Sequence, residues 1–230
     1  MRVLISETTW ASMPAARDLS TEGFLVTRAF DGESLVLFVR DAVQDAVVSD
    51  ADLGDITTAR AIRSIRIFRP NLPILALAKG ADRALQKELY QAGADYVETA
   101  EPTSEELAAR VRAAARRAAG YTMPLATLDD IVVDFDRRRV AVGSVSVALT
   151  PAEYEIVEHL ALNRKTVLSR DNIMTHLYGL EDGPDPKILD VHTTRIRKKL
   201  RSAGGDPSQL RTVTGRGYAL DGSRSMLSVA

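Results

Sequence analysis

Short apolar runs alternate with helical patterns along the first half of the chain. The apolar runs cover residues 3–5, 24–26, 46–48, 74–77 and 96–97. The segments near 14–22, 31–42, 57–68, 82–92 and 104–119 place apolar residues at helical spacing, and Thr103 with Glu106 forms a capping box for the last of them. Five units of a strand followed by a helix predict a parallel sheet that is covered by helices on both faces.

The pattern changes after Gly120. We interpret 120–126 as a linker between a domain at 1–119 and a domain at 127–222, with 223–230 as a flexible tail. The second domain begins with short strands at 131–135, 139–142 and 145–149. Three helices follow, and their start signals are Thr150 with Glu153, then Ser169, then Asp185 with Pro186. Residues 209–213 and 218–220 can pair across a loop that contains two glycines.

Composition excludes several classes of protein. The 230 residues contain no cysteine, so a disulfide framework, a thiol nucleophile and an iron–sulfur cluster are impossible. The sequence contains no nucleophile–histidine–acid arrangement and no phosphate-cradling loop, and three histidines leave little for a metal centre, so we expect no enzyme. No long apolar stretch follows the N-terminus, which favours a soluble, cytoplasmic protein that does not contact a membrane.

One segment breaks the balance between basic and acidic residues. The whole chain has 30 basic and 31 acidic side chains, but 195–201 carries five basic residues and no acidic one. In a helix over 186–201, Leu189, Ile196 and Leu200 would face a core, and most of the basic side chains would point outward. A basic helix after a short helix and before a glycine-tipped hairpin has the geometry of a winged helix, which inserts into the major groove of DNA. The alternative is a solvated turn whose cations interact with the helix dipole.

Three motifs in this half resemble the DNA-binding domain of OmpR/PhoB-type response regulators. They are Leu-Thr-Pro-Ala-Glu-Tyr-Glu at 149–155, Asp-Val-His-Thr-Thr-Arg-Ile-Arg-Lys-Lys-Leu at 190–200 and Thr-Val-Thr-Gly-Arg-Gly-Tyr at 212–218. With His-Leu-Tyr-Gly at 176–179, the half is most similar to the CtrA type of alphaproteobacteria. The resemblance implies an α/β, flavodoxin-like receiver domain followed by a winged helix-turn-helix domain. It also implies a cytoplasmic transcription regulator of a two-component system that binds promoter DNA.

The resemblance further implies which side chains of the basic helix meet DNA. The positions that match DNA contacts in the family are His192, Thr194, Arg195 and Arg197. We expect Arg195 to read a base, because a guanidinium can bond bidentately to the edge of a guanine. We expect Lys198, Lys199 and Arg201 to meet phosphate or solvent, and His192 could equally be a packed polar residue.

The hairpin and one loop complete the implied contacts. In the hairpin, Thr212 and Tyr218 match positions that contact the DNA backbone. Thr214 stands where some family members carry a minor-groove arginine, so either Arg216 takes that role or the role is lost. The loop 179–185 lies where the family is thought to touch RNA polymerase, although it could also be a plain connection.

The phosphorylation site of a receiver is kept only in part. Asp50 occupies the position of the phosphorylated aspartate, and Glu7 that of the first acidic metal ligand. Three other positions of the site differ. Thr8 replaces the second acidic ligand and Ala78 replaces the residue with the sensing hydroxyl. The lysine is replaced by Ala100, or by Thr99 in the neighbouring register. Because these losses remove a negative charge, a hydroxyl and a cation, we expect no bound Mg²⁺ and no other cofactor.

Asp50 therefore has two interpretations. It is a weakly phosphorylated nucleophile, or it is a structural acid that pairs with Lys79 or water, and the missing residues favour the second. We thus expect a regulator that works without phosphorylation of Asp50. The alternatives are a conventional phosphorylation switch and a receiver-like domain that senses a ligand or a protein, because Ala78 and Ala100 leave space in the pocket.

The resemblance also implies a homodimer. In the family, the face formed by the fourth helix, fifth strand and fifth helix pairs about a two-fold axis through crossed salt bridges. The matching positions here are Lys87, Asp95, Glu106 and Arg110. Surface ion pairs are individually weak, at about 0 to 1 kcal/mol, so apolar neighbours would contribute as much.

Overall fold

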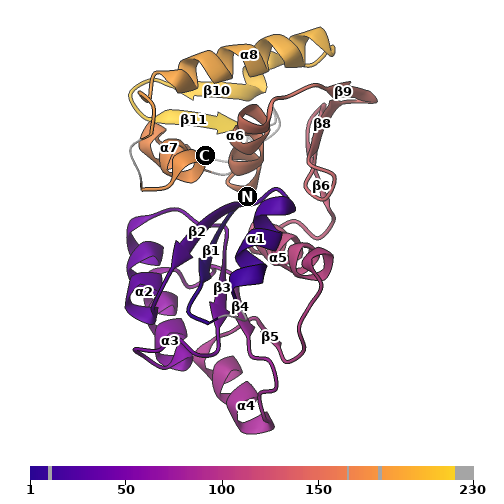
Figure 1. The fold of residues 1–230 in the computed structure, drawn as a ribbon. Helices are drawn as coiled ribbons and strands as arrows, with labels where there is room; N and C mark the ends of the chain where they lie inside the picture. Colours follow the sequence, from indigo (N-terminus) through magenta and orange to yellow (C-terminus); the bar gives the residue numbers. More distant parts are fainter. Residues whose placement is uncertain (10–11, 165, 181–182, 221–230) are drawn as a thin grey trace, which may run out of the picture. The chain divides into compact units, whose positions relative to one another are not determined.

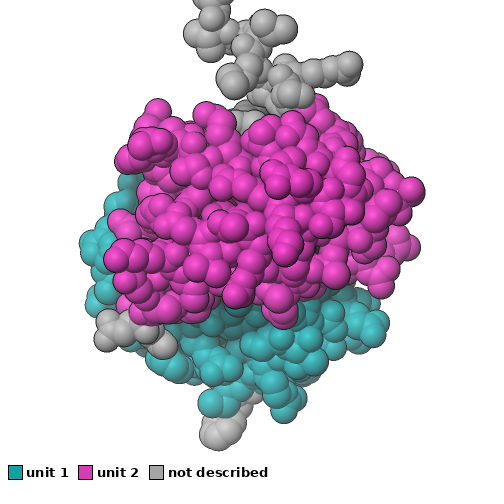
Figure 2. All heavy atoms as spheres, turned by 90° about the horizontal axis from the view of Figure 1, so that it is seen from above, with its two compact units in different colours: residues 1–118 teal, residues 119–230 magenta. Residues whose placement is uncertain are grey.

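The chain divides into two compact units. The computed structural model describes residues 1–9, 12–164, 166–180 and 183–220, and its contacts separate Met1–Ala118 from Ala119–Ala230 (Figure 2). The predicted tail at 223–230 lies outside the described residues. Among the described helices, none has both the length and the apolar character that crossing a bilayer requires.

Unit 1 is a five-stranded parallel sheet with helices on both faces (Figure 1). Its strands are β1 (Arg2–Ser6), β2 (Leu25–Ala29), β3 (Ala46–Asp50), β4 (Ile74–Leu77) and β5 (Tyr96–Glu98). Its helices are α1 (Met13–Thr21), α2 (Gly32–Asp41), α3 (Thr58–Phe68), α4 (Arg83–Ala92) and α5 (Ser104–Ala118). The strand order β2-β1-β3-β4-β5 is the flavodoxin-like order, which confirms the predicted fold class.

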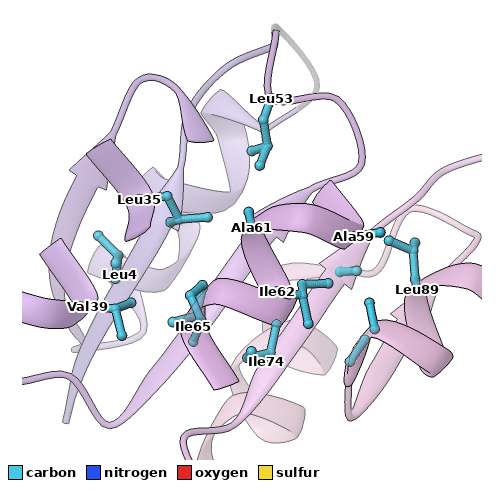
Figure 3. Packing of buried hydrophobic residues seen from close by; sticks show 14 of the residues in the cluster. Leu4, Leu35, Val39, Leu53, Ala59, Ala61, Ile62, Ile65, Ile74 and Leu89 are labelled. Atoms are coloured by element: carbon cyan, nitrogen blue, oxygen red, sulfur yellow. The ribbon is translucent and has the colours of Figure 1, made fainter. Parts of the chain in front are cut away.

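Burial explains why the strands of unit 1 are continuous apolar runs. Strands β1 and β3 are buried along their whole length, as expected of central strands that are covered on both faces. Leu4 of β1, Leu35 and Val39 of α2, and Ile62 and Ile65 of α3 belong to one buried hydrophobic cluster (Figure 3). The carboxyl ends of β1, β3, β4 and β5 meet at one edge of the sheet, and this edge holds the predicted receiver pocket.

Unit 2 combines an antiparallel sheet, three helices and a hairpin. The sheet has the order β6-β7-β8-β9, from β6 (Leu125–Leu128), β7 (Ile131–Asp134), β8 (Arg139–Val142) and β9 (Val145–Val147). The helices are α6 (Pro151–Leu162), α7 (Arg170–Tyr178) and α8 (Ile188–Ser202), followed by the short 3₁₀ helix η1 (Pro207–Gln209). The strands β10 (Leu210–Val213) and β11 (Gly217–Leu220) form the hairpin, so this unit has the predicted winged helix-turn-helix architecture.

Strand β6 was not predicted, and it shortens the linker. Residues 125–126, assigned to the linker, pair with β7, and burial alternates along the four residues of β6. Tyr121 also belongs to unit 2, because its hydroxyl donates to Ala161 O at 2.8 Å and its ring lies under the guanidinium of Arg164. A four-residue strand carries too little local signal to be recognised before its pairing partner is known.

The helices begin close to the predicted start signals. The capping boxes of Thr103 with Glu106 and Thr150 with Glu153 are both present, and Ser169 caps α7. Helix α8 begins two residues later than predicted. Residues 185–187 form a turn instead, in which Asp185 O accepts from Ile188 N at 2.9 Å.

Candidate DNA-binding surface and receiver pocket

Helix α8 presents basic side chains on one face. The residues of its opposite face, Leu189, Thr193, Ile196 and Leu200, are each at most 1% exposed. Their spacing of three or four residues places them on one side of the helix. The exposed residues of α8 are Asp190, Val191, Thr194, Arg195, Lys198, Arg201 and Ser202. Arg195, Lys198 and Arg201 therefore point outward, as predicted. Their cationic groups lie on one face of α8, where they can contact phosphate.

Arg197 holds the hairpin instead of pointing to solvent. Its Nε and Nη2 donate to Leu210 O at 2.9 and 2.7 Å, and Nη2 also donates to Thr212 Oγ1 at 2.7 Å. Both acceptors belong to β10. The guanidinium thus joins α8 to the wing in the chain without DNA, and its predicted DNA contact stays a prediction. Thr212 keeps its exposed position on that wing.

Asp190, at the start of α8, connects three elements. Arg170 of α7 donates to both carboxylate oxygens of Asp190 at 2.8 and 3.0 Å. Tyr218 of β11 donates its hydroxyl to the same carboxylate at 2.5 Å, and the Arg170 guanidinium lies over the Tyr218 ring. The bonds from Arg170 and Tyr218 hold the pKa of Asp190 below its usual value. Sequence reasoning missed this cluster, because 20 and 28 residues separate Asp190 from its partners.

Tyr218 is a core residue. Its side chain is 1% exposed, and burial raises the pKa of its hydroxyl. In the chain without DNA the hydroxyl faces Asp190, and the contact of Tyr218 with the DNA backbone stays a prediction. The residue fixes the wing against α7 and α8.

A glycine allows the wing to approach the segment before α7. Gly217 has φ +135°, and a Cβ there would lie 1.9 Å from Leu168 O. Leu168 and Tyr218 exchange two backbone hydrogen bonds of 2.8 and 2.9 Å. At the tip of the hairpin, Thr214 and Arg216 are exposed.

His192 and Lys199 lie at the edge of the basic face. Burial lowers the pKa of His192, so its neutral form predominates at pH 7 and it adds no charge to the surface. Lys199 donates to Glu153 Oε2 at 2.6 Å, and the Lys199 side chain is 34% exposed. The positive surface of α8 therefore consists of Arg195, Lys198 and Arg201.

In unit 1, Asp50 lies at the end of β3 with both carboxylate oxygens bonded to nearby groups of the same chain. Thr9 Oγ1 donates to Asp50 Oδ2 at 2.5 Å, and Asp52 N donates to Oδ1 at 3.1 Å. Thr8 Oγ1 donates to Asp52 O at 2.5 Å. Two threonine hydroxyls thus bond to acceptors around Asp50, at the sheet edge where a receiver would hold a metal ion. Thr9 was missed, since only the matching position Thr8 drew attention.

The cation that could pair with Asp50 lies elsewhere. Lys79 donates to Glu101 at 2.6 Å and its side chain is 66% exposed, so of the two partners that the sequence left open for Asp50, Lys79 is not the one used. Glu7, the predicted first metal ligand, forms an ion pair of 3.4 Å with Arg28 on β2. Among the described residues, no basic side chain forms an ion pair with Asp50.

A cavity of about 550 Å³ opens beside Asp50 at the carboxyl edge of the sheet. Ala100 lines it, as predicted for the position where a receiver has its lysine. Ala78 was also expected to leave space there, but it is 1% exposed and does not line the cavity. Its methyl group packs in the core of unit 1 instead.

The predicted dimer face keeps its charges, but most of them are paired within the unit. Asp95 accepts from Arg66 at 2.8 Å, and Arg110 pairs with Glu98 at 2.5 Å. Glu106 caps α5 through the backbone N–H of Thr103. Asp95, Arg110 and Glu106 thus have partners within their own unit, and the predicted dimer face stays a prediction. Lys87 is exposed on α4.

Comparisons with known proteins place the chain in a family. The family described as "Transcriptional regulatory protein, C terminal" matches residues 144–220. The cell cycle transcriptional regulator CtrA of Caulobacter vibrioides is 32% identical over 100% of both chains. The cell cycle response regulator CtrA of Brucella ovis is 34% identical over 96% of this chain and 95% of its own. The solved Klebsiella pneumoniae RstA DNA-binding domain in complex with RstA box is 29% identical over 43% of this chain and 98% of its own, with a TM-score of 0.38. The two full-length relatives show that this chain belongs to the CtrA-like response regulators of the OmpR/PhoB type.

Proposed function

We propose that this chain is a cytoplasmic transcription regulator that binds specific promoter sequences through α8 and the β10–β11 wing. The observation that carries the proposal is the row of exposed cations Arg195, Lys198 and Arg201 on α8, with Arg216 exposed at the wing tip. A helix of this kind fits the major groove, where Arg195 reads a base and Lys198 and Arg201 meet phosphates. The membership of the chain in a family of transcriptional regulators supports the same role.

The experiment is selection of bound sequences from a random DNA pool, followed by titration of the selected site and of bulk DNA. We expect the selected site to bind about 10³-fold or more tightly than bulk DNA at physiological salt. Equal affinity for the two would contradict sequence-specific binding.

The proposal includes activity without phosphorylation of Asp50. The carboxylate of Asp50 already accepts from Thr9 and from Asp52 N, and Lys79 pairs with Glu101. Transfer of a phosphoryl group to an aspartate needs a bound divalent cation, a hydroxyl and a second cation to balance the added charge. Thr8, Ala78 and Ala100 supply none of these at the matching positions.

Incubation of the full chain with acetyl phosphate and Mg²⁺ tests this point. We expect the intact mass to stay unchanged and the affinity for the selected site to stay the same with and without the phosphodonor. A stoichiometric gain of one phosphoryl group on Asp50, with a change in affinity, would instead support a conventional phosphorylation switch.

We also propose a homodimer that pairs through the face of α4, β5 and α5. Asp95 and Arg110 have partners in their own unit. The dimer would therefore be stabilised by packing of apolar side chains around Leu85 and by the exposed charge of Lys87. Sedimentation equilibrium of the full chain checks this, and Lys87→Glu should weaken the dimer while leaving the monomer folded. A monomer at all concentrations would exclude this part of the proposal.

The loop 179–185 is proposed to contact RNA polymerase. Its described part includes Leu180, which is 54% exposed, whereas residues 181–182 lie outside the described chain. Leu180→Ala should lower transcription in a reconstituted assay without changing the affinity for DNA. Unchanged transcription would favour the plain connecting loop.

A further inference from the structure

The cavity beside Asp50 has the size and apolar wall of a site for a small molecule. Its volume of about 550 Å³ lies within the range of about 300 to 1,000 Å³ that is usual for such sites. Apolar wall residues come from α1, β4, α4, α5 and the loop before α5: Pro14, Leu77, Leu85, Ala100, Pro102 and Leu107. All of them belong to unit 1, so the cavity depends on this unit alone.

The polar part of the lining is acidic. The described lining residues with charged side chains are Asp18, Asp50, Asp52, Glu98, Glu101 and Lys79. Lys79 is neutralised by Glu101, and Glu98 by Arg110. The carboxylates of Asp50 and Asp52 therefore give the cavity a negative potential that attracts cations.

Asp50 can accept further hydrogen bonds. A carboxylate has about four acceptor positions, and the bonds from Thr9 and Asp52 N take two of them. Asp50 is only 8% exposed, and no described basic side chain forms an ion pair with it. A charge in such surroundings is stabilised when a cationic hydrogen-bond donor approaches it.

We propose that the cavity binds a small organic cation, a protonated amine that carries an apolar body. The ammonium group donates to Asp50, and the body packs against Leu77, Leu85 and Leu107. The alanine at position 100 leaves the space that a lysine would fill, and a lysine there would also repel the ligand. The inference rests on the proposed phosphorylation-independent receiver domain, since a phosphoryl group on Asp50 would occupy the position of the ammonium group.

Three probes that share a phenyl ring test the charge preference. Full-length protein is titrated at pH 7 with 2-phenylethylamine, 2-phenylethanol and 3-phenylpropionate, which have cationic, neutral and anionic head groups. We expect saturable binding of the amine below about 10 mM, at least tenfold tighter than binding of the other two. Amide NMR shifts should be largest at Ala51, Leu77 and Ala100. Absence of amine binding, equal binding of the three probes, or shifts confined to other surfaces would overturn the inference.

Two variants test the ion pair with Asp50 and the free volume of the cavity separately. Asp50→Asn should weaken binding of the amine about tenfold or more, because a charge-assisted bond becomes a neutral one. Ala100→Leu should weaken binding of the amine by filling the cavity while it leaves Asp50 intact. Glu105→Gln is the matched control, because Glu105 is an exposed acid of α5 that does not line the cavity. If the control loses as much affinity as Ala100→Leu, the cavity is not the site.

The outcomes distinguish this inference from the proposed function. Phosphorylation of Asp50 by acetyl phosphate would overturn the proposed phosphorylation independence and, with it, the inference. A failed amine titration on a protein that resists phosphorylation would overturn only the ligand site.

Discussion

Replacing Asp190 with alanine should destabilise unit 2 and disturb the DNA-binding surface. The carboxylate of Asp190 joins α8 to Arg170 on α7 and to the Tyr218 hydroxyl on β11. The Asp190 and Arg170 side chains are 54% and 40% exposed, so their ion pair contributes only about 0 to 1 kcal/mol. The larger loss is the acceptor of the buried Tyr218 hydroxyl, which costs about 1 to 3 kcal/mol when left unsatisfied.

Together these contributions predict a loss of about 1 to 4 kcal/mol for Asp190→Ala. Urea unfolding of the full chain, monitored through NMR signals of residues in unit 2, measures the stability of unit 2 separately from that of unit 1. Asp190→Asn keeps an oxygen acceptor for Tyr218, so it should lose less than Asp190→Ala. The affinity for the selected DNA site should fall with Asp190→Ala, because the wing and α8 lose their common anchor.

A double-mutant cycle with Tyr218→Phe tests the reasoning. In the Tyr218→Phe background there is no buried hydroxyl that Asp190→Ala could leave without an acceptor. Asp190→Ala should therefore lower the free energy of unfolding much less in that background than in the native one. If the two changes are additive within about 0.5 kcal/mol, the bond between Asp190 and Tyr218 does not stabilise the protein and the argument fails.

Acid titration gives a second check on Asp190. Its pKa is lowered in the folded protein, first by the bond from Arg170 and then by that from Tyr218. A group of this kind contributes stability above its unfolded pKa of about 3.9, and the contribution is lost as the pH falls through the lower folded value. Asp190→Asn should therefore flatten the acid side of the stability curve of unit 2, and an unchanged slope below about pH 4 would contradict it.

Three further predictions concern DNA recognition and folding. Arg195→Ala should lower the affinity for the selected DNA site and reduce discrimination at one base position by about 1 to 3 kcal/mol. Lys198→Ala should weaken binding to all DNA sequences equally and reduce the slope of log affinity against log salt concentration by about 1. Competition binding with single-base variants of the site distinguishes the two effects. Gly217→Ala should lower the melting temperature of unit 2 by several degrees in calorimetry, because the new Cβ would lie 1.9 Å from Leu168 O. An unchanged melting temperature would contradict the close contact between the wing and Leu168. Arg66→Ala should destabilise unit 1 by about 2 to 4 kcal/mol in urea unfolding, because its loss would leave the part-buried carbonyls of Leu72 and Gly93 unsatisfied. A loss below about 0.5 kcal/mol would show that water replaces the guanidinium at these carbonyls.

Periodicity and local chemistry determined the elements of both units. The buried central strands β1 and β3 are rich in apolar residues, and all five strands of unit 1 were found from short apolar runs within a few residues of their bounds. Capping boxes act over three residues, and those at Thr103 and Thr150 were therefore visible in the sequence. The exposed direction of Arg195 followed from the spacing of its buried neighbours. Strand β6 was missed because its four residues acquire their strand character only by pairing with β7.

The sequence by itself determined the two folds, the basic face of α8 and the loss of receiver residues at Thr8, Ala78 and Ala100, because these depend on residue type and short spacing. Only the tertiary structure decided which charges are already paired. Arg197 bonds to β10, Lys79 to Glu101, and Asp95 to Arg66. A long, flexible side chain can reach several partners, and which of them is within 3 Å depends on how distant segments pack.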